Sequence, residues 1–437
     1  MGSHRAPSNG SDEDGHVLQR RHRPDYRIVL YMGLLMLMGL VVIYAIGPQR
    51  ANVLNNANNT TFYTATYFVI KQFISLAIAG LAFAFFAVVP FTLLKKHSIR
   101  LLQVGFGLCL LLFIAGNILH IDQIATSTLG AYRWFNLGAL GSFQPSEVLK
   151  FTILIYVAGF LGKRFQEGRV NSLKDSVYPV LGVAALGLGV IAVLQKDMGT
   201  SIALVSIVFS MLIASHVSWK LIGKIAGIGL IAGVLLILMA PHRMDRVVTF
   251  FNSGGSSVSD SDASDNNYHI KNAMIALGSG GLTGRGIGQS VQAAGYLPEA
   301  VNDSIFAVMG EIFGFVGTAL IIVLFSALLL RLLRIADNIR DMPMRLAVAG
   351  VFGWLAAHVV MNIASMTGLV PLTGITLPLL SFGGTSMVFM AGALGLVFQL
   401  SRFTSHKPVD VKEGARNEGT HSRWGVRRTR YAGRRSS

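Results

Sequence analysis

Charged residues are scarce in this chain. Asp, Glu, Lys and Arg make up 13% of the 437 residues, whereas an ordinary soluble domain carries about 25%. Hydrophobic residues account for 52% and gather in long runs rich in Leu, Ile, Val, Phe, Ala and Gly. A transmembrane β-barrel would show short alternating segments instead. The sequence therefore predicts an all-α polytopic membrane protein.

Cysteine and the common catalytic motifs are also nearly absent. The one cysteine, Cys109, lies inside an apolar run, so no disulfide framework is expected. The chain has no HExxH, Walker A or Ser/His/Asp pattern. His358 stands alone in an apolar segment, which favours an interior histidine. The Asp residues of the 252–267 loop lack the glycine and distal glutamate of an EF-hand, which favours a solvated linker.

Basic residues outnumber acidic ones, and the formal net charge is +16. Much of this charge lies in the tails and short connections, which is typical of membrane-topology signals. No nucleic-acid partner is predicted. The first apolar run, Ile28–Ile46, is long enough to span a membrane and lacks a small-residue cleavage site. We expect residues 1–26 to form a disordered cytoplasmic tail and residues 403–437 a basic cytoplasmic tail.

Ten spanning helices are predicted between residues 27 and 402. The expected ranges are 27–47, 66–89, 99–119, 145–162, 176–194, 199–215, 219–240, 303–333, 345–367 and 376–402. Alternate connections, together with both tails, are rich in Lys and Arg, so these should face the cytoplasm. The largest loop, 241–302, lies between the seventh and eighth helices and is then extracellular.

Two carboxylates, Asp303 and Glu311, stand at the entry to the eighth apolar run. A charge at the centre of a membrane helix costs about 2.5–3.5 kcal/mol, so each is a candidate functional group. On a helical projection, four small residues lie within about 40° of Asp303 and would let another helix approach. They are Ala307, Gly310, Gly314 and Gly317. Simple N-capping by Asp303 is an open alternative.

Cations on the predicted outer face run against the orientation rule, so each is a candidate ligand for an anion. They are Lys71, Arg133, Lys196, Arg243, Arg246 and Lys271. Snorkelling to the headgroup level is the alternative for Lys71, Arg243 and Arg246. The glycine-rich stretch 278–288 could also present amides to an anion.

Polar residues also occupy the entries to two other spans. Glu147 and Lys150 are three residues apart, just after Pro145, a favoured first-turn residue. They form either a structural ion pair or part of a binding site. Asp197 either caps the next helix or contributes to the site.

The last motif, residues 368–386, interrupts the helical pattern with two prolines and a glycine pair. Irregular backbone at membrane depth is tolerated where it lines a cavity or packs on protein. We therefore expect Pro371, Ser381, Gly383 and Gly384 to lie near Asp303.

Together these segments resemble the SEDS family (shape, elongation, division and sporulation), whose members include FtsW, RodA and SpoVE. The resemblance covers residues 27–402 in order. Its motifs are Gly-Ala-x-Arg133-Trp134, Phe143-Gln-Pro-Ser-Glu147-x-x-Lys150, Asp197-x-Gly199-Thr200, Arg243-x-x-Arg246, the Gly278–Gly288 stretch, Leu297-Pro-Glu299, Asp303-x-Ile-Phe-Ala-x-x-Gly-Glu311, and Pro371-x-Thr-Gly-Ile-x-Leu-Pro-x-x-Ser381-x-Gly-Gly-x-Ser386.

The resemblance implies a peptidoglycan glycosyltransferase that polymerises lipid II outside the cytoplasmic membrane and releases undecaprenyl pyrophosphate. Asp303 matches the essential aspartate of the family and would be the general base. The implied partners are a class B penicillin-binding protein and other division proteins. The 290–300 stretch is closer to FtsW than to RodA, which predicts septal synthesis. An elongation-type polymerase and a lipid II flippase are the alternatives.

The remaining site residues fall into two predicted groups. Predicted substrate-binding residues are Lys71, Arg133, Glu147, Lys150, Asp197, Arg243, Arg246, Lys271 and Ser381. Predicted structural or polarising residues are Glu311, Pro371, Gly383 and Gly384. A divalent cation, Mg²⁺ or Mn²⁺, could assist the reaction, although no ligand cluster identifies it.

The chain departs from the family pattern beside the aspartate. The family often has His-Thr before it and Phe after it, where this chain has Val301, Asn302 and Ser304. Ile312 replaces a second glutamate that often follows Glu311, and Lys196 replaces a frequent proline.

Overall fold

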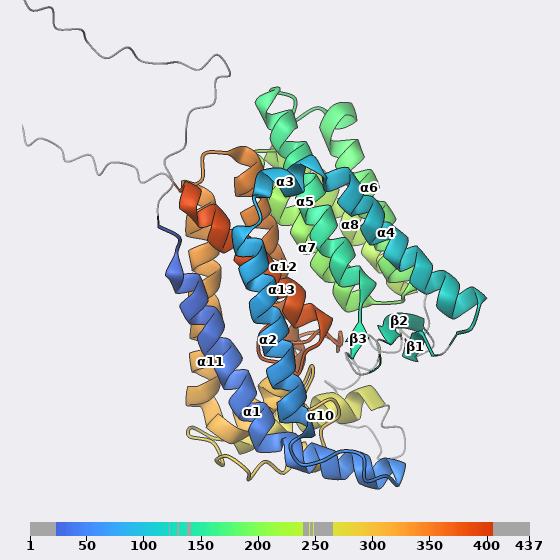
Figure 1. Ribbon diagram of the computed structural model, residues 1–437, viewed down its shortest axis with the longest axis vertical. Coiled ribbons are helices and arrows are strands. Elements are labelled where there is room, and N and C mark those ends of the chain that lie inside the picture. The colour runs from blue at the N-terminus through green and yellow to red at the C-terminus, as the bar shows by residue number, and fades with distance from the viewer. Residues whose placement is uncertain are drawn as a thin grey trace, which may run out of the picture. The chain divides into compact units, whose positions relative to one another are not determined.

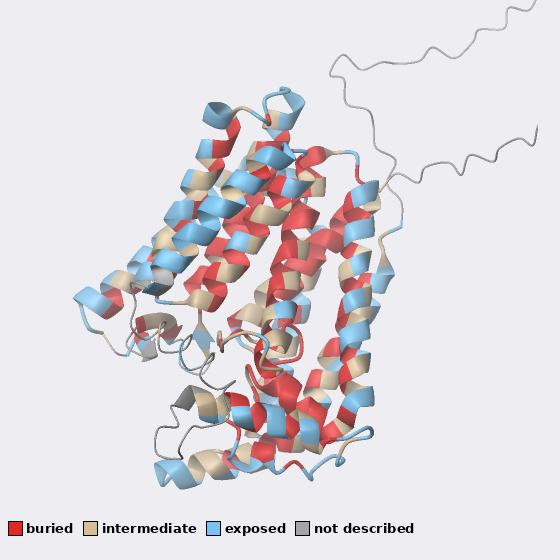
Figure 2. Ribbon diagram, turned by 180° about the vertical axis from the view of Figure 1, so that it is seen from behind, coloured by how far each residue is buried: buried red, intermediate tan, exposed pale blue. Residues whose placement is uncertain are grey.

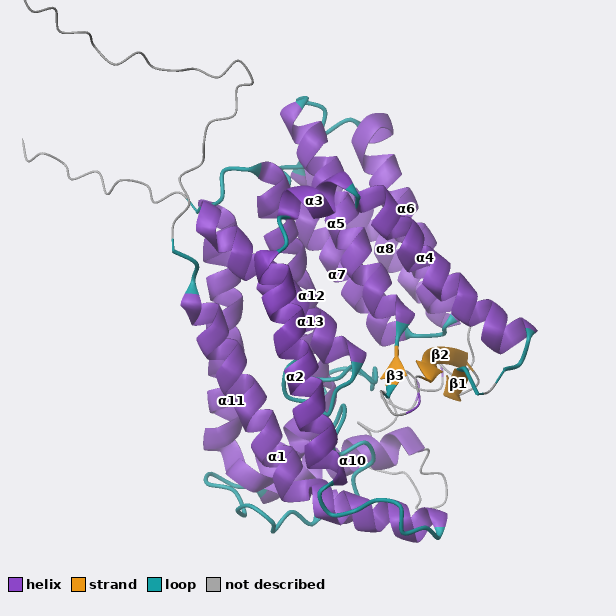
Figure 3. Ribbon diagram, viewed as in Figure 1, coloured by secondary structure: helices purple, strands orange, loops and turns teal. Residues whose placement is uncertain are grey.

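The computed structural model describes residues 23–404 apart from 122, 129–130, 137, 139–140, 239–243, 245–247 and 249–264. Helices make up most of this part of the chain (Figure 3). They are α1 (Tyr26–Asn58), α2 (Tyr67–Val88), α3 (Phe91–Lys96), α4 (Ser98–Phe113), α5 (Pro145–Gln166), α6 (Tyr178–Leu188), α7 (Met198–Ala214), α8 (Trp219–Leu238), α10 (Asp265–Ser279), α11 (Ile305–Asn338), α12 (Met342–Met366) and α13 (Thr385–Leu400). Short π-helical segments extend α4 to Ile118 and flank α6 on both sides.

Seven helical segments of the described residues are long and apolar enough to cross a membrane. They are Arg27–Asn58, Tyr67–Val88, Ser98–Ile118, Leu173–Leu194, Ile305–Asn338, Met342–Met366 and Thr385–Phe403. The protein is therefore a multi-pass membrane protein. The other three predicted spans correspond to α5, α7 and α8, and the count of ten stays a prediction.

Two helix boundaries differ most from the prediction. Helix α1 continues through Pro48 to Asn58, beyond the expected end at 47. Helix α13 begins at Thr385 instead of 376. Residues 376–384 form turns instead, because Pro378 cannot donate a helical hydrogen bond and Gly383 and Gly384 favour irregular backbone.

A small antiparallel sheet was not predicted by the all-α assignment. Its strands are β1 (Ala125–Thr128), β2 (Ala131–Asn136) and β3 (Ser142–Phe143), in the order β1-β2-β3. Phe135 is buried against Leu112 and Ala115, which explains why this segment folds onto the end of α4.

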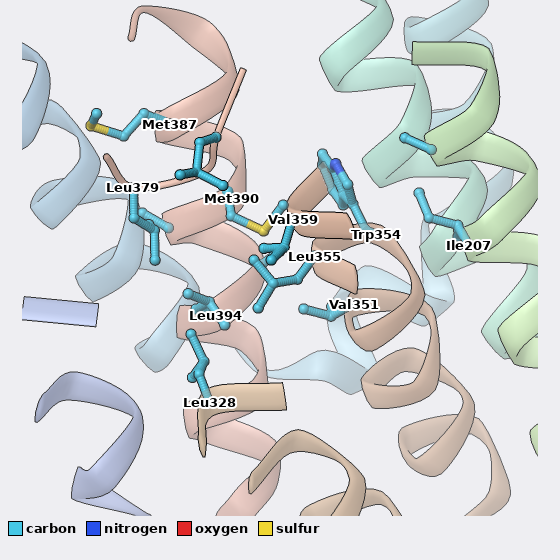
Figure 4. Packing of buried hydrophobic residues seen from close by; sticks show 14 of the residues in the cluster. Ile207, Leu328, Val351, Trp354, Leu355, Val359, Leu379, Met387, Met390 and Leu394 are labelled. Carbon is cyan, nitrogen blue, oxygen red and sulfur yellow. The ribbon is translucent and has the colours of Figure 1, made fainter. Parts of the chain in front are cut away.

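Helix α12 lies at the centre of the packing. It packs along α5, α7 and α11, and α2 packs along α13. Figure 4 shows Trp354 and Leu355 of α12 among Met390 and Leu394 of α13 and Ile207 of α7. Buried residues line the inner helix faces and exposed ones the outer faces (Figure 2). Exposed large side chains such as Phe73, Leu81 and Phe85 on α2 suit contact with lipid.

The sheet and α10 lie at one end of the long helices, the lower end in Figure 1. The first and last described residues lie at the other end. There Asp25 forms an ion pair with Arg331, its amide donates to Ser401, and Ile339 pairs with Thr404. The N-terminal ends of α5, α7, α11 and α13 all point toward the sheet and α10, which brings the candidate residues to this end.

Candidate functional site

Asp303 lies in the turn that precedes α11. The helix was expected to begin at Asp303, but Ser304 occupies the N-cap position and Ile305 is the first helical residue. The Asp303 side chain is 9% exposed. Its backbone carbonyl accepts a hydrogen bond from Nδ2 of Asn362 at 2.7 Å, and the same nitrogen donates to the Ile375 carbonyl at 2.7 Å. Asn362 therefore joins the Asp303 turn to the segment that follows α12.

That segment, residues 371–384, also contacts the turn directly. The Ser381 hydroxyl donates to the Asn302 carbonyl at 2.6 Å and accepts from the Leu377 amide at 2.8 Å. The Phe382 amide donates to the Val301 carbonyl at 2.7 Å. The sequence predicted that this irregular segment lies near Asp303, and the structure places it there. Ser381 acts here as a positioning residue, and its predicted contact with substrate stays a prediction.

The carboxyl group of Asp303 has an unusual electrostatic environment. Burial, and after it the charge of Glu299, raises the pKa of Asp303 to about 7. The Ser304 hydroxyl lies 3.5 Å from Oδ1 of Asp303. A general base works best with a pKa near the working pH. Asp303 can therefore exchange a proton near neutrality.

Glu311 lies in the second turn of α11 and is fully buried. Its carboxylate accepts hydrogen bonds from the Ser290 hydroxyl at 2.6 Å, the Val291 amide at 3.0 Å and the Gln292 amide at 3.2 Å. The guanidinium of Arg285 lies 3.7 Å away. These contacts fix residues 285–292 against α11, which supports a structural role for Glu311.

Helix α10 and the glycine-rich turn pack against the small-residue face of α11. A Cβ on Gly310 would lie 2.5 Å from the Leu277 side chain of α10. Helix α11 breaks at Gly314, where φ is 66°. The Arg285 amide donates to the Glu311 carbonyl at 2.9 Å and the Gly286 amide to the Ile312 carbonyl at 3.0 Å. These two amides complete the broken helix, so they are not directed at an anion.

Glu147 and Lys150 form a buried pair beside the 371–384 segment. Lys150 Nζ lies 2.9 Å from Oε1 of Glu147, with side chains 0% and 2% exposed. The ammonium also lies 4.7 Å from the Trp354 ring centroid and 3.5 Å from Nε2 of His358. Nδ1 of His358 lies 3.4 Å from the Thr376 carbonyl. This burial supports the structural interpretation of the pair and of His358; the substrate contacts stay predictions.

Arg133 and Asp197 hold the sheet against the start of α7. Nε and Nη2 of Arg133 donate at 2.9 Å to the carbonyls of Gln195 and Lys196. Asp197 accepts from the Thr200 amide at 3.0 Å, which makes it the N-cap of α7, and from Nε2 of Gln144 at 2.9 Å. The capping interpretation of Asp197 is therefore correct, and a role in binding remains to be tested.

The other predicted cations are more dispersed. Lys71 lies on α2, with its Nζ 4.9 Å from the centroid of the Tyr67 ring. The neighbouring Gln72 accepts from the Gly383 amide at 3.4 Å, so Lys71 is near the 371–384 segment. Lys271 is exposed on α10. Arg243 and Arg246 lie outside the described residues.

Carboxylates near Asp303 are the candidate metal ligands of the site. Within the described ranges, no three His, Cys, Asp or Glu side chains are grouped as a closed metal site. Mg²⁺ is often held by one or two carboxylates together with substrate phosphates. The carboxylates of Asp303 and Glu299, which interact electrostatically, fit only this open type of site. When bound there, a divalent cation would neutralise phosphate charge.

Sequence reasoning missed several residues of the site. Asn362 was not singled out, although a fully buried amide in an apolar span is itself a signal. Gln144 was also missed; its backbone amide donates to the Thr385 hydroxyl at 3.1 Å. His269 of α10 contacts Ser304 at 2.5 Å. No local pattern could have revealed that contact, because the two residues come from separate segments.

The fold and the site define a multi-pass membrane protein with a buried carboxyl group of near-neutral pKa at one end of its helices. Residues 26–406 match the family of cell cycle proteins that comprises FtsW, RodA and SpoVE. The chain belongs to this family.

Individual relatives cover most of the chain. Stage V sporulation protein E of Bacillus subtilis (strain 168) is 31% identical over 89% of this chain and 99% of its own length. The probable peptidoglycan glycosyltransferase FtsW of Polynucleobacter necessarius subsp. necessarius (strain STIR1) is 32% identical over 84% and 83%.

Solved structures show the same fold. A chain of a peptidoglycan synthase complex has a TM-score of 0.64 and 23% identity, covering 87% of this chain and 98% of its own. The rod shape determining protein RodA of Thermus thermophilus has a TM-score of 0.61 and 23% identity, with coverages of 88% and 98%.

Proposed function

We propose that this chain is a peptidoglycan glycosyltransferase that polymerises lipid II into glycan strands. The observation that carries the proposal is the buried Asp303, whose pKa of about 7 suits a general base. Family membership and relatives named probable peptidoglycan glycosyltransferases support the same reaction class.

The chemistry assigns Asp303 a defined step. Its carboxylate removes the proton of the acceptor sugar hydroxyl as that oxygen bonds to the anomeric carbon of the donor sugar. The bond from that carbon to undecaprenyl pyrophosphate breaks, and the pyrophosphate leaves with the electron pair. Asn362 and Ser381 act on the backbone of the turn and so keep the carboxyl group in place.

Cations stabilise the negative charge that develops on the leaving pyrophosphate. We assign this task to Lys71, Arg243, Arg246 and Lys271, with apolar helix faces seating the polyprenyl chain. Arg133 and the Glu147–Lys150 pair act indirectly, because their charged groups bind other parts of the protein. Arg243→Gln is expected to lose most polymerisation activity, whereas snorkelling alone predicts nearly normal activity.

The proposed topology has ten spans in residues 27–402, with both tails, 1–26 and 403–437, in the cytoplasm. The 241–302 loop and Asp303 then face outward. The basic connections support this orientation. It is also supported by the position of the described chain ends, opposite the end that holds the sheet and α10. Cysteines introduced singly at Ser279 and Ser172 should react with a membrane-impermeant thiol reagent only at Ser279.

The proposed partner is a class B penicillin-binding protein, and the proposed place of action is the division septum. The likeness to a chain of a peptidoglycan synthase complex supports a partner of this kind. The relatives named FtsW support a role in division. Purification of the chain with each class B protein of its own organism should identify one stable complex.

Polymerisation of labelled lipid II by the purified protein tests the proposed function. With its partner, the wild-type chain should convert lipid II into long glycan strands that a muramidase degrades. The partner alone is the control and should leave lipid II unchanged. Movement of lipid II across vesicle membranes without polymer formation would contradict the proposal and favour a flippase.

A further inference from the structure

We propose that His269 is a positioning residue for Asp303 and acts through the hydroxyl group of Ser304. The inference rests on the proposed glycosyl transfer and adds to it a residue from a separate helix, α10. His269, Ser304 and Asp303 would form one connected chain of side chains, which we call the His269–Ser304–Asp303 chain.

The Ser304 hydroxyl has three polar neighbours. Its Oγ lies 2.5 Å from Nε2 of His269, 2.9 Å from the Pro298 carbonyl and 3.5 Å from Oδ1 of Asp303. Ser304 itself is 0% exposed. No water can therefore replace a lost partner without a change in the packing, so each contact constrains where the oxygen lies.

The hydrogen count explains what His269 does. A hydroxyl group carries one hydrogen and accepts through its oxygen. The Pro298 carbonyl and the Asp303 carboxylate only accept, so they compete for the Ser304 hydrogen. Nε2–H of His269 can donate to the Ser304 oxygen, which leaves that hydrogen for one of the two acceptors. Catalytic hydrogen bonds are often long before substrate binds, as the 3.5 Å contact is.

Helix α10 is a firm support for the imidazole. Ala273 and Ala276 are fully buried, and the Leu277 side chain fills the space above Gly310 of α11. Helix α10, which carries His269, is therefore packed against α11, and the first turn of α11 follows Asp303.

The arrangement depends on the residue at 304. A side chain without a polar group at this position could not pass on a hydrogen bond. Here the serine provides a hydroxyl group and α10 provides the imidazole that contacts it. The turn itself supplies no imidazole, since Val301 and Asn302 precede Asp303.

Kinetics of variants test the proposal. Four variants are compared with wild type in lipid II polymerisation with the partner: His269→Ala, His269→Gln, Ser304→Ala and the double alanine variant. Misplaced catalytic groups lower the rate of the chemical step, so each alanine variant should lose about tenfold in kcat with KM unchanged. The double variant should be no slower than Ser304→Ala. His269→Gln should restore at least half of the wild-type kcat, because its amide can still donate.

Ser279→Ala is the matched control. It removes a hydroxyl group from the last residue of α10, and that hydroxyl donates to the carbonyl of Ala276 in its own helix. It should keep wild-type kcat. Wild-type kcat in His269→Ala would overturn the proposal. So would losses that multiply in the double variant, or a glutamine variant as slow as the alanine variant.

Unfolding in detergent separates this inference from the proposed function. The Tm losses of His269→Ala and Ser304→Ala should not add up to the loss in the double variant. Additive losses would overturn the contact. Polymerisation by wild type with independent effects of the two residues overturns only the His269–Ser304–Asp303 chain. Absence of wild-type polymerisation overturns the proposed function and, with it, the positioning role.

Discussion

Asp303 and Glu311 are both buried at the same end of α11, and their partners differ. Glu311 accepts three hydrogen bonds, from Ser290, Val291 and Gln292, and lies near the guanidinium of Arg285. The carboxyl group of Asp303 interacts with the Ser304 hydroxyl at 3.5 Å and with the amides of its own residue and of Ser304, and it is opposed by the charge of Glu299.

The difference separates a structural carboxylate from a reactive one. Three donors satisfy the carboxylate oxygens of Glu311 and join it to residues 290–292. Burial, and after it the charge of Glu299, raises the pKa of Asp303 to about 7. Perturbed groups of this kind are concentrated at functional sites. Glu311 therefore organises the surrounding turn, and the proton transfer is the role that we propose for Asp303.

Asp303→Asn is expected to have the largest effect on activity. General base catalysis contributes about 10²–10⁴-fold to a rate, so lipid II polymerisation should fall by about that factor. The bond from Asn362 should survive because it goes to the backbone carbonyl. The Tm in detergent should therefore stay within about 2 °C of wild type. Polymerisation at the wild-type rate would remove Asp303 from the mechanism.

Glu311→Gln should act mainly on stability. The amides of Val291 and Gln292 donate to different carboxylate oxygens, so the glutamine NH₂ group would face one of them and leave that donor without an acceptor, at a cost of about 1–3 kcal/mol. Chemical unfolding in detergent measures this loss. Glu167→Gln is the matched control at an exposed ion pair with Arg164 and should cost less than about 1 kcal/mol. A stable but inactive Glu311→Gln protein would contradict the structural assignment.

Asn362→Leu tests how precisely the Asp303 turn must be held. The leucine has a similar shape but cannot donate to the carbonyls of Asp303 and Ile375. A small displacement of a catalytic group slows the chemical step, so kcat should fall by about tenfold while KM changes little. Asn338→Leu, whose amide donates within its own helix, should keep normal kinetics. Equal activity in the two variants would show that the turn is held by other contacts.

Much of the fold followed from the sequence. The long apolar runs predicted a helical membrane protein, and seven helices of the described residues are long and apolar enough to span a membrane. The strands were missed because residues 125–143 are too short and mixed to show a clear period. The later start of α13 was missed because apolar residues continue through the 376–384 turns.

The site was predictable in outline and not in its contacts. An aspartate at an apolar entry and a broken helix near the end of the chain predicted which segments meet. The different partners of Asp303 and Glu311 could not be predicted, because Ser290 and Glu299 lie in a loop without helical or strand periodicity. Burial of the Glu147–Lys150 pair beneath Trp354 likewise depends on how α5 packs on α12.

The pH dependence of polymerisation tests the central claim most directly, because a base acts in its ionised form. With Asp303 protonated below its pKa of about 7, kcat/KM should rise with pH and level off above about 7. Glu299→Gln removes the like charge and should shift this rise to lower pH. A rise centred near 4, the ordinary value for an aspartate, would contradict the account. So would a profile that Glu299→Gln leaves unchanged.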